Sequence, residues 1–198
     1  MSGPHAQASA IDPLCIALPL WIGEVVDRSQ TFPDDESRVR LAIQLARENV
    51  ERQTGGPFGA AIFEARSGRL VSVGVNLVAP LSNSVLHAET VAIMFAQRAV
   101  GSFTLATQSD HTSHVLATSC APCAMCLGAI HWSGVSRVLI GATRDDATRI
   151  GFDEGPVFPE SIAYLERNGI HFVGGIARDS AVAVFDRYIE LGRPIYNG

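Results

Sequence analysis

Two short segments of the chain carry residue types that bind transition metals. The first, SVLHAETVAI, spans residues 84–93 and places His87 two positions before Glu89. The second, SCAPCAMCLGAI, spans residues 119–130 and holds three of the four cysteines of the chain. Imidazole nitrogen and thiolate sulfur are common zinc ligands in proteins. The two segments together therefore predict one zinc site.

The spacing of the cysteines suits a site at the start of a helix. Cys123 and Cys126 are three positions apart, so both sulfur atoms lie on one helix face. The positive end of the helix dipole favours the thiolate form that binds metal. With His87 as the third ligand, a position is left for water, as in catalytic zinc sites. We expect Cys120, which precedes the proline turn, to be a small buried residue and not a fourth ligand.

Glu89 lies where a carboxylate could move protons during hydrolysis. Zinc lowers the pKa of a bound water to about 7, and a nearby carboxylate can pass that proton to a substrate. H-x-E combined with P-C-x-x-C is the signature of zinc-dependent nucleobase deaminases. Each half alone is a weak signal, because single histidines, first-turn acids and paired cysteines are common. Together they predict one zinc ion per chain, held by His87, Cys123 and Cys126, with Glu89 as a catalytic carboxylate.

The elements around these motifs alternate between helices and strands. From hydrophobic periodicity and turn residues we expect, in order, a helix over 34–53, a hairpin about the turn 66–69, a helix over 87–100, a strand over 114–119, a helix over 123–132, a strand over 136–143, a loop over 144–159, a helix over 160–168, a strand near 171–175 and a helix over 178–191. This order predicts a three-layer α/β/α fold with a mixed central sheet of about five strands and helices on both faces.

Composition narrows the function classes. The chain has 198 residues, which fits one domain, and a net charge of −5, which argues against a nucleic-acid partner. Four cysteines are too few for a disulfide scaffold. The apolar patch at 14–22 has no preceding basic residue and is interrupted by proline, so it does not resemble a signal peptide. We expect a cytoplasmic protein without a membrane span, whose N-terminal segment packs as a strand or loop on the domain.

The motifs resemble the cytidine-deaminase-like superfamily and, within it, the bacterial guanine deaminases. The resemblance covers about residues 38–160 and rests on GGPFGAAIF at 55–63, Asn76 after VGV, HAE at 87–89, PCAMCLGAI at 122–130 followed by Trp132, and DDATRIGFDE at 145–154. It implies a single deaminase domain over 1–198, with an N-terminal extension over 1–30 and a C-terminal segment over 160–198. The run LGAI after the second cysteine is shared with purine-type deaminases, including those that act on transfer RNA.

The loop GFDE at 151–154 is the most informative part of the resemblance. In guanine deaminases a similar loop ends in an acid that acts as a second proton shuttle, which assigns this role to Glu154. The resemblance also assigns substrate binding to Asn76. Phe58 and Trp132 could stack on a flat base, although either could equally belong to the core. A solvated loop acid at Glu154 and a turn residue at Asn76 are the alternatives.

The resemblance implies hydrolysis of guanine to xanthine and ammonia by a zinc enzyme. The same chemistry on an amino-triazine or a pterin, adenosine deamination in transfer RNA, and a zinc-stabilised binding module remain alternatives. Ala121 stands where the family usually has glutamate before the proline, and LSNSVL at 81–86 also departs from the family pattern. We expect a small-molecule nucleobase as the partner, no nucleic acid, no membrane, and a homodimer in which 127–134 could form part of the interface.

Overall fold

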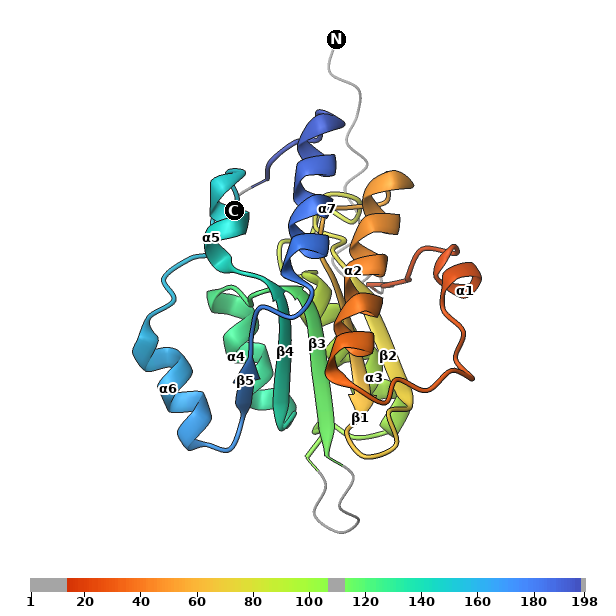
Figure 1. Ribbon diagram of the computed structural model, residues 1–198. Coiled ribbons are helices and arrows are strands. Elements are labelled where there is room, and N and C mark those ends of the chain that lie inside the picture. Colours follow the sequence, from red (N-terminus) through yellow and green to blue (C-terminus); the bar gives the residue numbers. More distant parts are fainter. Residues whose placement is uncertain (1–13, 107–112, 197–198) are drawn as a thin grey trace.

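The computed structural model describes residues 14–106 and 113–196 (Figure 1). The elements in chain order are α1 (Ile22–Val25), α2 (Asp35–Glu51), β1 (Gly59–Glu64), β2 (Leu70–Val75), α3 (Ala88–Val100), β3 (His114–Cys120), α4 (Ala124–Ser133), β4 (Arg137–Ala142), α5 (Arg144–Arg149), α6 (Pro159–Arg167), β5 (His171–Val173) and α7 (Arg178–Glu190). The strands form one sheet in the order β2-β1-β3-β4-β5. β1 pairs antiparallel with β2 and β3, whereas β3, β4 and β5 run parallel. The predicted mixed sheet is confirmed.

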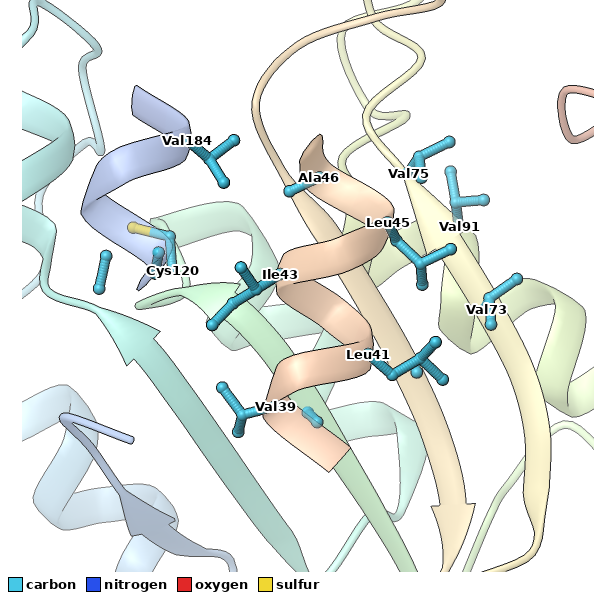
Figure 2. Close-up of a cluster of buried hydrophobic side chains, with 14 of the residues drawn as sticks. Val39, Leu41, Ile43, Leu45, Ala46, Val73, Val75, Val91, Cys120 and Val184 are labelled. Atoms are coloured by element: carbon cyan, nitrogen blue, oxygen red, sulfur yellow. The ribbon is translucent and has the colours of Figure 1, made fainter. Parts of the chain in front are cut away.

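Successive residues of the central strands point to opposite faces of the sheet. On β1, Ala61 and Phe63 join a core with α2 and α7, whereas Ala60 and Ile62 join a second core with α3 and α4. Figure 2 shows part of the first core, with side chains from α2, β2 and α7. Helices therefore cover both faces of the sheet, as predicted, and α3 and α4 lie together on one of them (Figure 1).

The segment 144–159, expected to be a loop, begins with the short helix α5. Thr143 and Asp146 form a capping box, in which the Thr143 hydroxyl accepts from the Asp146 amide and the Asp146 carboxylate accepts from the Thr143 amide. Asp146 also accepts two hydrogen bonds from the guanidinium of Arg178 at the start of α7. The prediction is wrong for residues 144–149, because the capping box stabilises a helix there although five of these six residues are charged or polar.

The described part of the N-terminal segment packs on the domain, as expected, but it contains the single helical turn α1. Trp21 and Phe32 are each 5% exposed and join the first core. This segment therefore lies against α2 and the hairpin. In the parts of the chain that the structure describes, we find no helix whose length and apolar character would let it cross a membrane.

Candidate active site

Three potential zinc ligands meet where two helices begin. His87 is the N-cap of α3, and Cys123 is the N-cap of α4, three residues after β3 ends at Cys120. The donor atoms of His87, Cys123 and Cys126 all lie within 4.8 Å of one another. This set of one imidazole and two thiols fits a zinc ion with room for one further ligand. Cys120 lies outside the group and is 2% exposed, with its thiol donating to the carbonyl of Thr143 at 3.4 Å, as expected of a buried residue.

The protonation of one of these side chains, Cys123, also suits a cation. A hydrogen bond from Cys126 and, after it, one from His87 lower the pKa of Cys123 to about 4, although burial opposes the change. Burial favours the neutral ring of His87, but the contact with Cys123 and the charge of Glu89 outweigh it and raise its pKa. Sγ of Cys123 and Nδ1 of His87 are 3.5 Å apart. A thiolate, the form that binds metal, is therefore present at neutral pH.

Glu89 lies in the first turn of α3, next to the metal-binding group but not part of it. Its side chain is nearly buried, with 7% of the residue exposed, and the Cys126 thiol donates to its Oε2 at 3.5 Å. Burial raises the pKa of Glu89, and the negative charge of Cys123 adds to the effect. A carboxylate with a raised pKa can both accept and release a proton near neutral pH.

A pocket of about 390 Å³ opens beside the metal-binding group, a volume that suits a small ligand. It brings together six of the residues that the sequence singled out, namely Phe58, Asn76, His87, Glu89, Cys123 and Glu154. These residues come from the starts of α3 and α4, the loop before β1, the end of β2 and the loop after α5. Segments distant in sequence thus form one concave site.

Asn76 follows β2 directly and presents its amide to this pocket. It is 1% exposed, and its Oδ1 accepts a hydrogen bond from the amide of Val78 at 3.2 Å. Gly56 lies so close that an added Cβ would overlap the hydroxyl of Tyr196 and approach Oδ1 of Asn76. The glycine-rich segment therefore passes close to the pocket wall, and a side chain at position 56 would have to displace Tyr196.

Phe58 serves both as part of the core and as part of the pocket wall. Its ring lies edge-on to Phe152, with centroids 5.0 Å apart, and to Phe185, with centroids 5.6 Å apart. The residue also lines the pocket. Phe58 therefore occupies both of the positions that the sequence allowed for it, in the core and beside the pocket.

Trp132 lies neither in the pocket nor in the core, the two positions that the sequence allowed for it. The residue is 77% exposed, and its ring contacts His131, with centroids 4.8 Å apart. At about 1.5 Å per residue, Trp132 is about 12 Å along α4 from the pocket-lining Ala124. Trp132 is thus close to the cysteine motif in sequence but not close to the pocket in space.

Glu154 reaches the pocket from the loop that follows α5. Its backbone carbonyl accepts a hydrogen bond from the amide of Ala124 at 3.0 Å, which ties the loop to the start of α4. Burial raises the pKa of Glu154 to about 8, with further contributions from the charges of Cys123 and Glu89. The raised pKa lets this carboxyl carry a proton at a higher pH than a solvated loop acid does.

Tyr196 is a pocket residue that sequence analysis did not single out. Its ring packs edge-on against Phe152, with centroids 5.2 Å apart, and it lines the same pocket as the metal-binding group. Its hydroxyl is buried and has no hydrogen-bond partner among the described residues. Burial raises the pKa of Tyr196, so the hydroxyl stays protonated as a donor. No local pattern in the tail ELGRPIYNG indicates this long-range contact.

Comparison with known proteins identifies the family. The family described as "Cytidine and deoxycytidylate deaminase zinc-binding region" matches residues 33–142. Guanine deaminase of Bacillus subtilis (strain 168) is 36% identical over 137 residues, which cover 69% of this chain and 83% of that protein. A structure of guanine deaminase from Nitrosomonas europaea has a TM-score of 0.85 and 36% identity and covers 91% of this chain and 98% of that chain. A structure of a mutant of the protein NE0047 in complex with 8-azaguanine has a TM-score of 0.86 and 35% identity. The match covers 93% of this chain and 100% of that chain. The chain therefore belongs to the family of zinc-binding cytidine and deoxycytidylate deaminases and is an aminohydrolase.

Proposed function

We propose that the protein catalyses the hydrolytic deamination of guanine to xanthine and ammonia. The observation that carries the proposal is that Glu89 and Glu154, two acids with raised pKa values, line one pocket with the zinc-binding group. The similarity to guanine deaminases, and to a structure that holds 8-azaguanine, supports guanine as the base. Guanine and 8-azaguanine share the 2-amino group that the reaction removes.

His87, Cys123 and Cys126 would hold the zinc ion. When bound there, zinc supplies Lewis-acid activation of water, whose pKa it lowers to about 7. Glu89 takes a proton from the attacking water and delivers it to the ring nitrogen beside C2. Oxygen thereby adds to C2, and the ring carbon becomes tetrahedral.

Glu154 completes the reaction at the departing group. Its carboxyl, whose protonated form burial favours, donates a proton to the amino nitrogen, so that the C2–N bond breaks and ammonia leaves. As ammonia leaves, the hydroxyl on C2 gives its proton back to Glu154, and C2 becomes the carbonyl carbon of xanthine. Two acids with different positions thus serve two different atoms of one substrate.

Asn76, Phe58 and Tyr196 bind the base in this scheme. The amide of Asn76 can both donate and accept, which suits the lactam or imidazole edge of a purine. Phe58 offers an apolar ring at the wall, and Tyr196 offers a hydroxyl without a protein partner. A base that fills the pocket would give that hydroxyl an acceptor.

A Tyr196→Phe variant should bind guanine less tightly and yet be at least as stable as the wild type. Loss of one hydrogen bond to the base raises KM by about three- to tenfold. The free protein, in contrast, no longer buries an unpaired hydroxyl, which costs about 1–3 kcal/mol. Steady-state kinetics and thermal unfolding of the two proteins check both parts. A lower Tm with an unchanged KM would show that the hydroxyl has a structural partner instead.

Elemental analysis should find one zinc per chain, and the Cys123→Ser variant should lose most of it. Serine offers a hydroxyl with a far higher pKa than the Cys123 thiol, so it supplies no anionic ligand. Cys120→Ser is the matched control, because that thiol lies three residues away and outside the donor group. Equal zinc loss in both variants would contradict the assigned ligand set.

A substrate panel with ammonia detection tests the proposed activity. Guanine, an amino-triazine, a pterin and a transfer-RNA stem-loop with a target adenosine would each be offered to the zinc-loaded protein. We expect kcat/KM to be highest for guanine. Faster release of ammonia from any other member of the panel would reassign the substrate while leaving the deaminase family intact.

We also propose that the enzyme is a cytoplasmic homodimer that acts in purine catabolism. Its four cysteines are free, as expected in a reducing compartment. The apolar residues of α4 are spread around the helix, and two of them, Met125 and Trp132, remain 37% and 77% exposed. A second copy of the chain would cover these two side chains. Light scattering that gives the mass of one chain would refute the dimer.

A further inference from the structure

Asn49 lies at the centre of a buried hydrogen-bond network behind the pocket wall. The residue is on the last turns of α2 and is 0% exposed. Its Nδ2 donates to the carbonyl of Gly56 at 2.9 Å and to the carbonyl of Asn76 at 3.0 Å. Its Oδ1 accepts from the hydroxyl of Thr54 at 2.7 Å. Every polar atom of this amide is therefore paired with the segments that lead to the pocket.

The network continues into the N-terminal segment through Trp21. The indole Nε1 donates to Oγ1 of Thr54 at 2.9 Å, and the same hydroxyl donates onward to Asn49. All donors in this series point the same way, from the indole to the two backbone carbonyls, so the bonds can strengthen one another. Trp21 is held in place by burial and by the guanidinium of Arg52, which lies 5.7 Å from its ring centroid.

The two backbone carbonyls that accept hydrogen bonds from Asn49 belong to Gly56, two residues before Phe58, and to Asn76. The side chain of Asn76 lines the pocket, and the backbone N–H of Asn76 donates to the carbonyl of Phe58 at 3.1 Å. A Cβ added at Gly55 would overlap the Asn76 carbonyl, so the two backbone segments are already in close contact. The side-chain Nδ2 of Asn49 donates one hydrogen to each of the two carbonyls and thereby fixes how the two segments meet. The direction of the Asn76 amide and the position of the Phe58 ring depend on that junction.

We infer that Asn49 is a positioning residue for the base, and that Thr54 and Trp21 hold its amide in the required orientation. The N-terminal segment thereby takes part in substrate binding without touching the substrate. This inference rests on the proposed guanine deamination. The competing explanation is that the network only stabilises the fold, in which case its loss lowers Tm and leaves KM unchanged.

Three variants remove successive parts of the network: Asn49→Leu, Thr54→Val and Trp21→Phe. Asn49→Leu and Thr54→Val replace a polar group by an apolar one of similar shape, and Trp21→Phe removes the indole N–H together with part of the ring. We expect KM for guanine to rise in all three, by about tenfold in Asn49→Leu and by less in the other two, with a smaller change in kcat and unchanged zinc content. Ser72→Ala is the control, because Ser72 is also buried and donates to a backbone carbonyl, that of Ala92, on the other side of β2.

A KM within about twofold of wild type in Asn49→Leu and Thr54→Val, with a Tm loss like that of Ser72→Ala, would overturn the inference. If Asn49→Leu does not fold, Thr54→Val decides, because valine keeps the shape of threonine. Hydrogen exchange provides a readout that needs no turnover. The amides of Phe58 and Asn76 should exchange faster in the variants, even if the wild type does not act on guanine. Unchanged exchange at both amides would refute the positioning role on its own.

Discussion

Replacing Glu89 with glutamine should abolish guanine turnover while the protein keeps its zinc. The amide cannot accept the proton of the attacking water, and loss of a general base lowers kcat by about 10²- to 10⁴-fold or more. Glu89 lies outside the group formed by His87, Cys123 and Cys126, so the variant retains all three ligands. Ammonia release under saturating guanine, together with elemental analysis of the same sample, checks both parts.

The structure indicates that this variant remains folded. The thiol of Cys126 donates to Oε2 of Glu89, and the amide oxygen of glutamine can accept the same hydrogen bond. Because Glu89 is buried with a raised pKa, an uncharged replacement of the same shape does not increase the cost of burial. Activity within a few-fold of wild type in a zinc-loaded variant would show that another group carries the proton.

A Glu154→Gln variant should show a strongly reduced kcat with a smaller change in KM. Proton donation to the leaving amine occurs in the transition state, so its loss affects turnover more than binding. The loop stays in place, because its link to α4 uses the backbone carbonyl of residue 154 and the amide of Ala124. Glu154→Asp should retain part of the activity, since the acid survives and is only one methylene shorter.

The matched control for Glu154 is Glu160→Gln, an exposed acid in the first turn of α6. We expect near-normal kinetics for that variant. If Glu154→Gln is also near normal, the carboxyl is not a proton shuttle, and the main reason to favour guanine over other bases is lost. A raised KM with normal kcat would instead make Glu154 a binding residue.

The zinc-binding group could be predicted because its signals are local. Cys123 and Cys126 share a helix face at a spacing of three, and His87 and Glu89 open a second helix, so short motifs carry most of the geometry. The alternating pattern of the strands and the periodicity of the helices likewise predicted one sheet with helices on both faces. Glu154 required the resemblance to a family, because a loop acid has no local pattern that places it in a pocket.

The residues that the sequence did not reveal depend on long-range packing. Tyr196 reaches the pocket from the C-terminal segment and lies next to Gly56, whereas Asn49 on α2 contacts the backbone behind the pocket wall. Trp132 is the opposite case, because it follows the cysteine motif in sequence but lies on the exposed surface of α4, away from the metal ligands. Contacts of this kind are set by how the elements pack, which no single stretch of sequence records.

Deamination of guanine in water labelled with oxygen-18 tests the central claim most directly. The zinc-loaded protein should convert guanine to xanthine that carries one labelled oxygen at C2, with ammonia released in equal amount. Mass spectrometry of the xanthine and an ammonia assay on the same reaction measure both products. Guanine left unchanged by the zinc-loaded protein, or ammonia released without the labelled oxygen at C2, would contradict hydrolysis at this site.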